Sequence, residues 1–554
     1  MKNRIFNYVS AVCLVAGCSA MLIYGKRDDF GLNRNMEILV NLMRELATVY
    51  VDEVDPDRMM QGAAIGMVRS LDPYTEFISE EDLKNFEVMT TGKYGGIGSI
   101  IRYRDDYVRI AQPYKGSPAD KAGLRIGDKI LEVNGKDARG FTTDKVSREL
   151  KGEPGTMVKV KVEHLDGSVH KYEIPRQRIS IPGIPYAGWL TDSIGYVRHS
   201  DFTEGCYEDM RAAIIRMHET GRLKGMILDY RSNGGGILQE AVKILGMFLP
   251  NGTDVVTTKG RDKDTLDVYT TATEPLFPDL KLAVLVNSST ASSAEIVAGS
   301  LQDMDRAVVL GQRSFGKGLV QSTRPTGYNS MVKVTTAKYY IPSGRCIQAI
   351  DYSHSQEGSI REVPDSLITE FRTRNGRKVY DGGGVMPDIE TKPEYISRFA
   401  MTLYALGYID DFGDDYMRRH PDFDPDLRTF TITEEDYADF CHFMEGKKVD
   451  FKSDTRHGLE QLKKSAEEEH FDEFAEEIKR MEEALKDDTQ SNLETYRKQL
   501  IDQINTDLIQ RVAYTEGVIE HSMVEDKEVL RAIETLNNEE EFLRILREQD
   551  TRKK

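Results

Sequence analysis

A buried strand passes directly into a helix in the stretch LAVLVNSSTASSAEIVAGSLQ (residues 282–302). Its first five residues are all apolar, and apolar residues recur at helical spacing from about residue 292 onward. Two more strands of this kind are expected, MILDY at 226–230 and RAVVLG at 306–311. The first is followed by GGG at 234–236 and a helix over 238–248. Strands that alternate with helices from residue 179 to residue 392 predict a layered α/β core.

The segments on either side of this core have different patterns. Residues 92–178 give short β-rich runs around GGIG at 95–98 and around an Asn-Gly pair at 134–135, which is typical of a tight turn between strands. Residues 35–91 carry apolar residues at helical spacing and predict a small helical cap. Residues 393–554 are rich in charge and helix formers, which predicts solvated helices packed on the body or on another subunit.

Length and composition set the broad class. A chain of 554 residues is expected to form several domains. Its 39% hydrophobic and 30% charged residues are ordinary for a soluble globular protein. A net charge of −18 argues against a nucleic-acid binder, which needs a basic surface.

The N-terminus has the pattern of a targeting segment. Lys2 and Arg4 precede an apolar stretch from residue 5 to residue 24, so residues 1–25 are expected to be a secretory signal or a membrane anchor. VAGC at 15–18 also resembles a bacterial lipoprotein processing box, in which Cys18 would carry the lipid. Alternatively, Cys18 is one apolar residue of an uncleaved anchor. These patterns predict an exported protein on the periplasmic side of a bacterial envelope.

The serine at the start of the 292–302 helix is the first chemical feature. Ser292 lies at the positive end of the helix dipole, where free backbone N–H groups point outward. Such donors can hold the negative oxygen that forms when an amide carbonyl is attacked. Taken alone, however, a serine at a helix start is more often an ordinary N-cap.

A lysine between two glycines follows in FGKG at 315–318. Lys317 can act as a general base only if its pKa falls by several units from about 10.4. Burial among neighbours such as Phe315, Leu319 and Val320 would lower it in this way. The alternative is a surface lysine in a turn, which is commoner for a lone GKG.

Other site types are not indicated. The glycine triplet lacks the spacing of a nucleotide-binding loop, and no HExxH or GxSxG motif is present. The cysteines beyond the leader (Cys206, Cys346 and Cys441) are odd in number and far apart, so neither a disulfide framework nor a metal site is expected. We expect no metal and no cofactor.

Several longer motifs resemble, in the same order, those of the carboxyl-terminal processing proteases, also called tail-specific proteases. They cover residues 36–390 and include YVDEVD (50–55), SLDPYTEF (70–77), GSPADKAGLRIGDKILEVNG (116–135), LDYRSNGGG (228–236), STASSAEIVAGSLQD (289–303), FGKGLVQ (315–321), TTAKYYIPSGRCIQ (335–348) and GGVMPDI (383–389). The resemblance implies a peptidase core of the crotonase and ClpP type, with an inserted PDZ domain at 92–178, a helical cap before it and a helical extension after the core.

The same resemblance assigns catalytic roles. It makes Ser292 the nucleophile, Lys317 the base and Gln321 the residue that orients the lysine. It gives Asp303 a structural or supporting role. One departure is that a second serine directly follows the nucleophile, so that two adjacent serines compete for its role; the spacing to Asp303 and Lys317 favours Ser292.

The oxyanion donors implied by the resemblance are the backbone N–H groups of Ser293 and Gly235. A second departure bears on them, because Gly234 stands where the family has a proline, which loosens this loop and leaves the donor open.

The PDZ domain implied by the resemblance would bind the carboxyl end of a peptide as an added strand. The carboxylate would be held by the N–H groups of Gly96, Ile97 and Gly98. The last side chain would enter an apolar pocket of Leu124, Val146 and Leu150, for which plain domain core is the alternative.

The expected function is therefore that of an exported serine endopeptidase. It would cut proteins near unstructured, apolar C-terminal tails, in the processing or quality control of envelope proteins. One rival hypothesis is a peptide-binding adaptor with a silent catalytic centre. Another makes the C-terminal helices a platform for homo-oligomerisation or for docking a partner.

Overall fold

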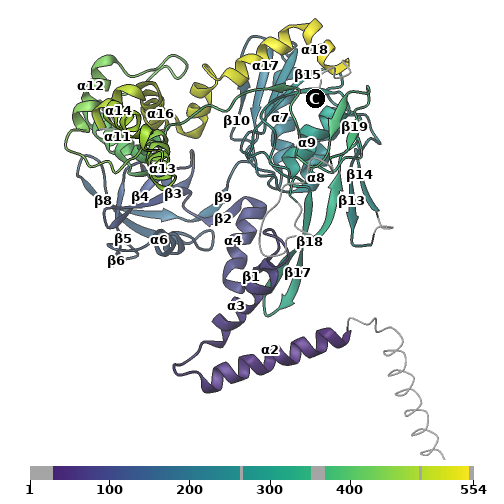
Figure 1. Cartoon of the computed structure of the whole chain (residues 1–554), viewed down its shortest axis with the longest axis horizontal. Coiled ribbons are helices and arrows are strands. Elements are labelled where there is room, and N and C mark those ends of the chain that lie inside the picture. Colours follow the sequence, from purple (N-terminus) through teal and green to yellow (C-terminus); the bar gives the residue numbers. More distant parts are fainter. Residues whose placement is uncertain (1–28, 263–265, 351–367, 486–488, 548–554) are drawn as a thin grey trace, which may run out of the picture. The chain divides into compact units, whose positions relative to one another are not determined.

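The computed structural model describes residues 29–262, 266–350, 368–485 and 489–547 (Figure 1). The leader and Cys18 lie outside the described residues, so the expectations about them stay predictions. The chain forms two compact units. One contains the described residues up to Leu83 together with Gln321–Thr335, and the other contains Lys84–Val320 and the chain from Thr336 onward.

The smaller unit contains two helices and a small sheet. Its elements are α2 (Asp29–Val49), α3 (Pro56–Arg69), β1 (Glu76–Ile78), most of β17 (Leu319–Gly327) and the first half of β18 (Ser330–Tyr340). β1 pairs antiparallel with β18, with Phe77 opposite Val332. The expectation that residues 35–91 are all helical is therefore wrong at β1, because the partner of this short strand lies more than 250 residues later in the sequence.

From Gly31 to Val49, where its burial is described, helix α2 has no buried residue. Thirteen large apolar side chains between Leu32 and Leu71 are at least 39% exposed. Exposed apolar side chains in such number are expected at an interaction surface.

The larger unit begins within helix α4 (Glu80–Thr91) and continues with a β-rich part. Its elements are β2 (Lys93–Gly96), β3 (Ser99–Arg104), β4 (Tyr107–Pro113), α5 (Pro118–Lys121), β5 (Lys129–Val133), β6 (Lys136–Asp137), α6 (Thr143–Leu150), β7 (Met157–Glu163), β8 (Val169–Pro175) and β9 (Gln177–Ser180). The main sheet has the order β3-β4-β5-β7-β8, so β3 lies at an edge, and α6 packs beside β3 and β5. β2 and β9 pair with each other where the chain enters and leaves this part.

A second, mostly parallel sheet forms the centre of the larger unit. Its order is β10 (Tyr186–Trp189), β11 (Ile194–Arg198), β12 (Gly225–Asp229), β15 (Lys281–Val286), β16 (Ala307–Gly311) and β21 (Ile389–Glu390). Only β10 runs antiparallel to its neighbour. Helices α7 (Cys206–His218), α8 (Leu238–Gly246) and α9 (Ser293–Asp303) cover one face. The remaining strands of this part are β13 (Asp254–Gly260), β14 (Leu266–Thr270), β19 (Glu370–Arg372) and β20 (Lys378–Tyr380).

Alternation along the strands explains why both faces of this sheet are covered. In β15, Leu282, Val284 and Val286 point into the core under α7, α8 and α9, while Ala283 and Leu285 point into a second core on the other face. All five are fully buried, so the strand reads as a continuous apolar run.

The C-terminal extension is divided between two locations. Helices α10 (Arg398–Ala405), α11 (Tyr408–Arg419), α12 (Glu434–Phe443), α13 (Asp454–Glu468), α14 (Ala475–Ala484), α15 (Thr489–Thr495) and α16 (Arg497–Ser522), with the 3₁₀ turn Asp472–Phe474, follow the core, and most of them share an aromatic core of their own. Helices α17 (Lys527–Asn537) and α18 (Glu539–Arg547) return to the parallel sheet and cover its second face (Figure 1). The last described helices thus complete the α/β core.

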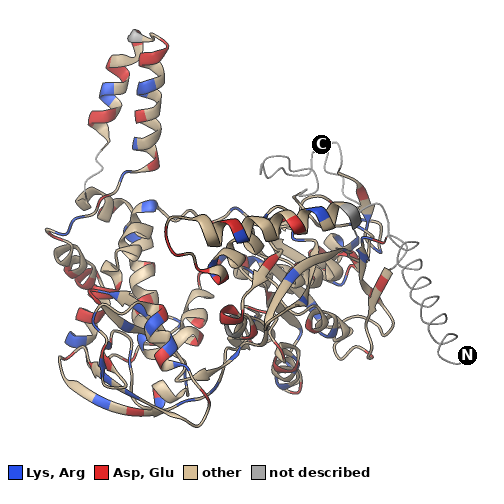
Figure 2. Cartoon of the chain, turned by 90° about the horizontal axis from the view of Figure 1, so that it is seen from below, with Lys and Arg blue, Asp and Glu red and all other residues tan. Residues whose placement is uncertain are grey.

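Acidic and basic residues are interspersed along the helices (Figure 2). No helix in the described part of the chain is both long enough and apolar enough to span a bilayer.

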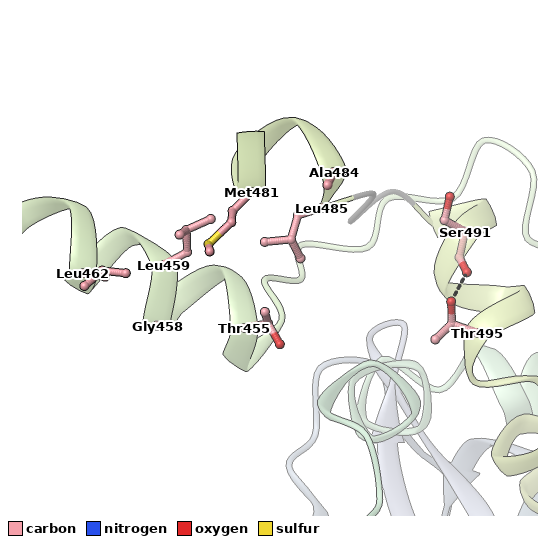
Figure 3. A pocket seen from close by; sticks show the side chains of 9 residues that line it. All are labelled: Thr455, Gly458, Leu459, Leu462, Met481, Ala484, Leu485, Ser491 and Thr495. Carbon is pink, nitrogen blue, oxygen red and sulfur yellow. Dashed lines mark hydrogen bonds between the residues drawn. The ribbon is translucent and has the colours of Figure 1, made fainter. Parts of the chain in front are cut away.

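A pocket of about 710 Å³ opens between α13, α14 and α15, and none of the side chains that line it is charged (Figure 3). Its lining residues are Thr455, Gly458, Leu459, Leu462, Met481, Ala484, Leu485, Ser491 and Thr495.

Candidate active site

Ser292 occupies the sharp turn between β15 and α9. Its backbone has φ 57° and ψ −121°, a conformation that L-residues rarely adopt. Strain of this kind persists only where the surrounding structure enforces it, and it clusters at functional sites. A strained strand-to-helix turn is also the device by which other hydrolases expose a serine nucleophile. Ser292 is half-buried, so its hydroxyl remains reachable.

The neighbouring Ser293 has a different environment. It is only 2% exposed, and its hydroxyl donates a hydrogen bond of 2.9 Å to the carbonyl of Gly236. As the first residue of α9, it has a backbone N–H without a partner inside the helix. The geometry therefore separates the two serines, with Ser292 suited to nucleophilic attack and Ser293 to structural support.

A buried carboxylate joins the turn of Ser292 to the loop of Lys317. Glu295 is fully buried, and one of its oxygens accepts hydrogen bonds from the N–H groups of Ser292 and Lys317, each at 2.9 Å. Its other oxygen accepts from the N–H of Gly316 at 2.7 Å and from the Ser314 hydroxyl. Burial raises the pKa of Glu295 to about 7, although these four hydrogen bonds oppose the shift. Glu295 thus fixes the backbone of both candidate catalytic residues.

Tyr339 makes a second connection between the same two residues. Its hydroxyl lies 3.2 Å from the carbonyl oxygen of Ser292 and also contacts the carbonyl oxygen of Lys317. The ring is 1% exposed, so the contact is shielded from water. Strand β18 therefore supports the turn and the loop together.

The two glycines around Lys317 have a steric role. A Cβ on Gly316 would lie 2.4 Å from the Cβ of Ala349, and one on Gly318 would lie 2.8 Å from the N of Gln348. Gly316 also has φ 85°. Only glycine fits at either position, and the loop is thereby held close to residues 347–349.

The surroundings of Lys317 differ in part from the expectation. Lys317 is half-buried and Leu319 is 7% exposed, but Phe315 is 43% exposed and gives little shelter from water. Phe315 points outward because its backbone N–H is tied to the Thr290 carbonyl and the chain turns directly afterwards. The role of Lys317 as base stays a prediction.

The glycine loop lies against Ser292, as its expected role requires. A Cβ on Gly235 would lie 2.6 Å from the Cβ of Ser292. The N–H of Gly235, however, donates to the side-chain oxygen of Asn233 at 2.8 Å. The expectation of a free Gly235 donor is therefore not met in this conformation, because Asn233 forms an Asx turn that takes it up.

Two further residues of the expected site have other contacts. Gln321 belongs to the smaller unit, where its amide donates to Thr335 at 3.2 Å, and its role beside Lys317 stays a prediction. Asp303 ends α9, is 1% exposed, pairs with Arg345 at 2.8 Å and accepts the N–H of Ser343 at 3.0 Å. Burial raises the pKa of Asp303. These contacts fit a supporting role.

The residues expected to bind peptide lie in the β-rich part. Gly96 ends β2, while Ile97 and Gly98 lead from β2 to the edge strand β3. Ile97 is 2% exposed, so its side chain belongs to the core. The three expected pocket residues are all buried in that same core: Leu124, Val146 and Leu150. Core packing is thus what the structure shows for them, and a pocket role stays a prediction.

Within the described ranges, no group of three or more His, Cys, Asp or Glu is placed to hold a metal ion. Cys206, Cys346 and Cys441 form no disulfide among the described residues.

Sequence analysis missed Glu295 and Tyr339 as members of the site. For Glu295 a signal was present, since Ser292 and Glu295 have the S-x-x-E spacing of a capping box. Tyr339 lies within the motif at 335–348, but nothing in that motif indicates that its hydroxyl contacts the loops of Ser292 and Lys317.

Comparison with known proteins places the chain. The family profile "Peptidase family S41" matches residues 193–354, "PDZ domain" matches 109–164, and "Probable PDZ-protease, C-terminal helical domain" matches 399–536. A carboxy-terminal-processing protease of Bartonella bacilliformis is 34% identical over 357 residues, which are 63% of this chain and 81% of the relative. The chain belongs to peptidase family S41, among the carboxy-terminal-processing proteases.

The chain is also similar to the following proteins. A probable CtpA-like serine protease of Staphylococcus aureus is 34% identical over 324 residues, which are 57% of this chain and 64% of the relative. Among solved structures, the photosystem II D1 C-terminal processing protease is 27% identical with a TM-score of 0.34, over 63% of this chain and 86% of that one. The chain is thus a serine peptidase with an S41 core, a PDZ domain and a C-terminal helical domain.

Proposed function

We propose that this S41 peptidase cuts unfolded polypeptides near their C-terminal ends by a Ser–Lys mechanism. Neutral Lys317 takes the proton of Ser292 as that serine attacks a peptide carbonyl, and later returns it to the leaving amine. Water then hydrolyses the acyl-enzyme. The observation that carries the proposal is the buried Glu295 carboxylate, which holds the backbones of Ser292 and Lys317 at 2.9 Å each.

The oxyanion of the intermediate needs donors beside Ser292. The Ser293 N–H is one, because the first N–H groups of a helix have no partner within it. The second is the Gly235 N–H, once a substrate oxygen replaces the side chain of Asn233 as its acceptor. This exchange would let the resting enzyme keep its buried donor satisfied.

Substrate capture is assigned to the PDZ domain. Its edge strand β3 can accept a peptide as an added strand, and Gly96, Ile97 and Gly98 stand at the start of that edge. The partners proposed are polypeptides with unstructured, apolar C-terminal tails. The basic and apolar leader supports export to the periplasmic side of a bacterial envelope, with membrane or lipid anchoring at the N-terminus and a role in processing envelope proteins.

The test compares two unfolded substrates that differ only in their last residues. We expect cleavage near the C-terminus of the substrate with an apolar tail, at least tenfold faster than that of one whose last residues are aspartate. Mass spectrometry of the fragments locates the cut, and the Ser292→Ala variant controls for contaminating peptidases. Equal cleavage of both tails would remove the capture step, and cleavage by the Ser292→Ala variant would remove the whole proposal.

Assembly of the peptidase with itself is the second proposal. Along α2 and the residue that follows it, apolar residues recur at alternating steps of four and three residues: Leu32, Met36, Leu39, Met43, Leu46 and Tyr50. This is the a/d heptad pattern of a helix that packs against another helix. The positions that flank the seam are uncharged as well: Asn33, Asn35, Val40, Leu42, Ala47 and Val49. A second α2 fits such a seam without repulsion.

A membrane surface is a poorer fit to α2. Helices that lie on membranes carry many basic residues on their polar face. The charged residues of α2 are Asp29, Arg34, Glu37, Arg44 and Glu45, which sum to a net charge of −1.

The uncharged pocket between α13, α14 and α15 is a further place where a partner could dock on the C-terminal helices, as expected from sequence (Figure 3).

The Leu39→Asp variant should weaken self-association at least 100-fold, because it places a charge in the apolar seam. Asn41→Asp adds the same charge on the opposite side of α2 and should leave association unchanged. Sedimentation of the full chain over a range of concentrations measures both. A wild-type protein that stays monomeric, or a Leu39→Asp variant that associates like Asn41→Asp, would show that α2 does not pair with itself.

A further inference from the structure

A charged cluster lies at the end of β12, directly before the glycine loop. Asp229 is fully buried and accepts a hydrogen bond of 2.6 Å from the Tyr196 hydroxyl. It pairs with Arg198 at 2.8 Å and with Arg231 at 2.6 Å. Burial alone would raise the pKa of Asp229, but the positive charges of Arg231 and Arg198 have the larger effect and lower it to about 2. Asp229 is thus a fixed negative charge that anchors Arg231.

The other side of Arg231 is held by helix α17. One of its terminal nitrogens lies 2.7 Å from Asp526 and 2.8 Å from Glu528. The three side chains are 16%, 19% and 12% exposed, so their charges interact largely out of water. Glu528 additionally accepts from the Gln312 amide at 2.9 Å and from the Thr391 hydroxyl. The start of α17 is therefore tied to the carboxyl end of the sheet at several points.

Arg231 in turn fixes the first residues of the glycine loop. Its carbonyl accepts a hydrogen bond of 2.8 Å from Arg198. The next residue, Ser232, has φ 61°, which a serine adopts only where its neighbours impose it. The Ser232 N–H donates to the side chain of Asn287 at 2.8 Å, and three residues later the loop reaches Gly235 beside Ser292.

We propose that Asp526 and Glu528 are positioning residues for catalysis. By holding Arg231 they fix the glycine loop in the place where it lies against Ser292. The last helices of the chain would then act on the rate of the reaction in addition to covering the sheet. This inference rests on the proposed function of Ser292 and the glycine loop.

The docking of α17 does not depend on these two carboxylates alone. Val529, Ala532 and Leu536 are at most 4% exposed and pack into the core on the second face of the sheet. Removal of two charges at the start of the helix should leave this apolar contact in place. The variants can therefore be compared as folded enzymes.

The experiment uses the double variant Asp526→Asn/Glu528→Gln in the full chain. Asparagine keeps the N-cap that Asp526 gives to α17, through hydrogen bonds of 2.9 Å from Glu528 and 3.1 Å from Val529. We expect kcat on an apolar-tailed peptide to fall at least tenfold, with KM within twofold of the wild type. The charge-retaining variant Asp526→Glu/Glu528→Asp should recover part of the loss.

Lys527 provides the matched control. It lies between the two carboxylates in sequence, but its own ion pair, with Glu394 at 3.0 Å, is exposed to solvent on both sides. Lys527→Gln should therefore leave kcat unchanged. If the double variant keeps the wild-type kcat, the positioning role is wrong. It is also wrong if kcat falls, KM rises and the midpoint of unfolding falls together, because the variant is then simply less well folded. If instead the wild type itself does not cut or the Ser292→Ala variant does, the proposed function fails.

Discussion

Ser292→Ala should reduce kcat roughly 10⁵-fold or more, the scale seen when a nucleophilic serine is removed from a hydrolase. The neighbouring hydroxyl is not suited to replace it. Ser293 is adjacent, but its hydroxyl is buried and donates to the Gly236 carbonyl at 2.9 Å. It also lies inside the first turn of α9, whereas Ser292 precedes it on the strained turn. The loss should therefore be nearly complete in Ser292→Ala alone.

Ser293→Ala is the matched control for this prediction. It removes the hydrogen bond to Gly236 and so loosens the glycine loop, a loss of about 1 kcal/mol that corresponds to less than tenfold in rate. Single-turnover cleavage of an apolar-tailed substrate measures both variants. The reverse ranking, with Ser293→Ala inactive and Ser292→Ala active, would transfer the nucleophile to Ser293.

Lys317→Ala should be impaired to a similar degree, since the serine then lacks its base. The two losses should not add, because both residues act in the same proton transfer. A double variant that is much slower than either single variant would show that Ser292 and Lys317 act separately.

Local patterns in the sequence were enough to predict the frame of the site. The apolar run 282–286 and the helix after it place Ser292 at a strand-to-helix turn, and the structure has this turn between β15 and α9. The glycines of FGKG predict a loop that turns closely, and the structure shows contacts there that exclude any side chain. The two turns depend on neighbours in the chain, which is why sequence alone reveals them, whereas the contacts of Gly316 and Gly318 are with residues about thirty positions later.

Features that depend on distant partners could not be read in this way. Tyr339 reaches the site only because β18 pairs with β13 in the larger unit. Helix α17 has one apolar stripe among charged residues, a pattern that is the same whether the helix packs on its own sheet or on another subunit. The Asx turn in which the Asn233 side chain accepts the Gly235 N–H could have been predicted from the sequence. An asparagine two residues before a glycine is typical of such a turn.

Glu295→Gln should lower kcat at least 100-fold, although Glu295 is not expected to touch the substrate. The Glu295 carboxylate is the acceptor in all four of its hydrogen bonds, and two of the donors are the N–H groups of Ser292 and Lys317. A glutamine amide would turn an N–H group toward two of these donors, and one loop would have to move. A displacement of about 1 Å between reacting groups costs on the order of 10²-fold in rate.

Glu240→Gln is the matched control for Glu295→Gln. Glu240 is 4% exposed in the same core and accepts the N–H of Tyr207 at 2.9 Å, but it has no hydrogen bond to either catalytic loop. Its replacement should cost stability and leave kcat within a fewfold of the wild type. Equal kcat values for the two variants would mean that Glu295 is only one more buried carboxylate.

The raised pKa of Glu295 also predicts how stability and kcat change with pH, and the two should change in opposite directions. Burial raises the pKa from 4.5 to about 7, so the folded chain holds a proton there more tightly than the unfolded chain. This contribution to the free energy of unfolding is fully present below pH 4.5 and is lost as the pH rises through about 7. Catalysis should respond in the other direction, because only the ionised carboxylate accepts all four hydrogen bonds, and kcat should fall as the pH drops below about 7.

Glu295→Gln removes the titration and so isolates it. Relative to this variant, the wild type should lose about 3 kcal/mol of stability between pH 4.5 and pH 7, since one pKa unit corresponds to about 1.4 kcal/mol. Unfolding measured at several pH values for both proteins gives the difference directly, because every other titrating group is shared. A difference that stays constant with pH would mean that Glu295 is already ionised throughout this range, and its titration could not then lower kcat at acid pH.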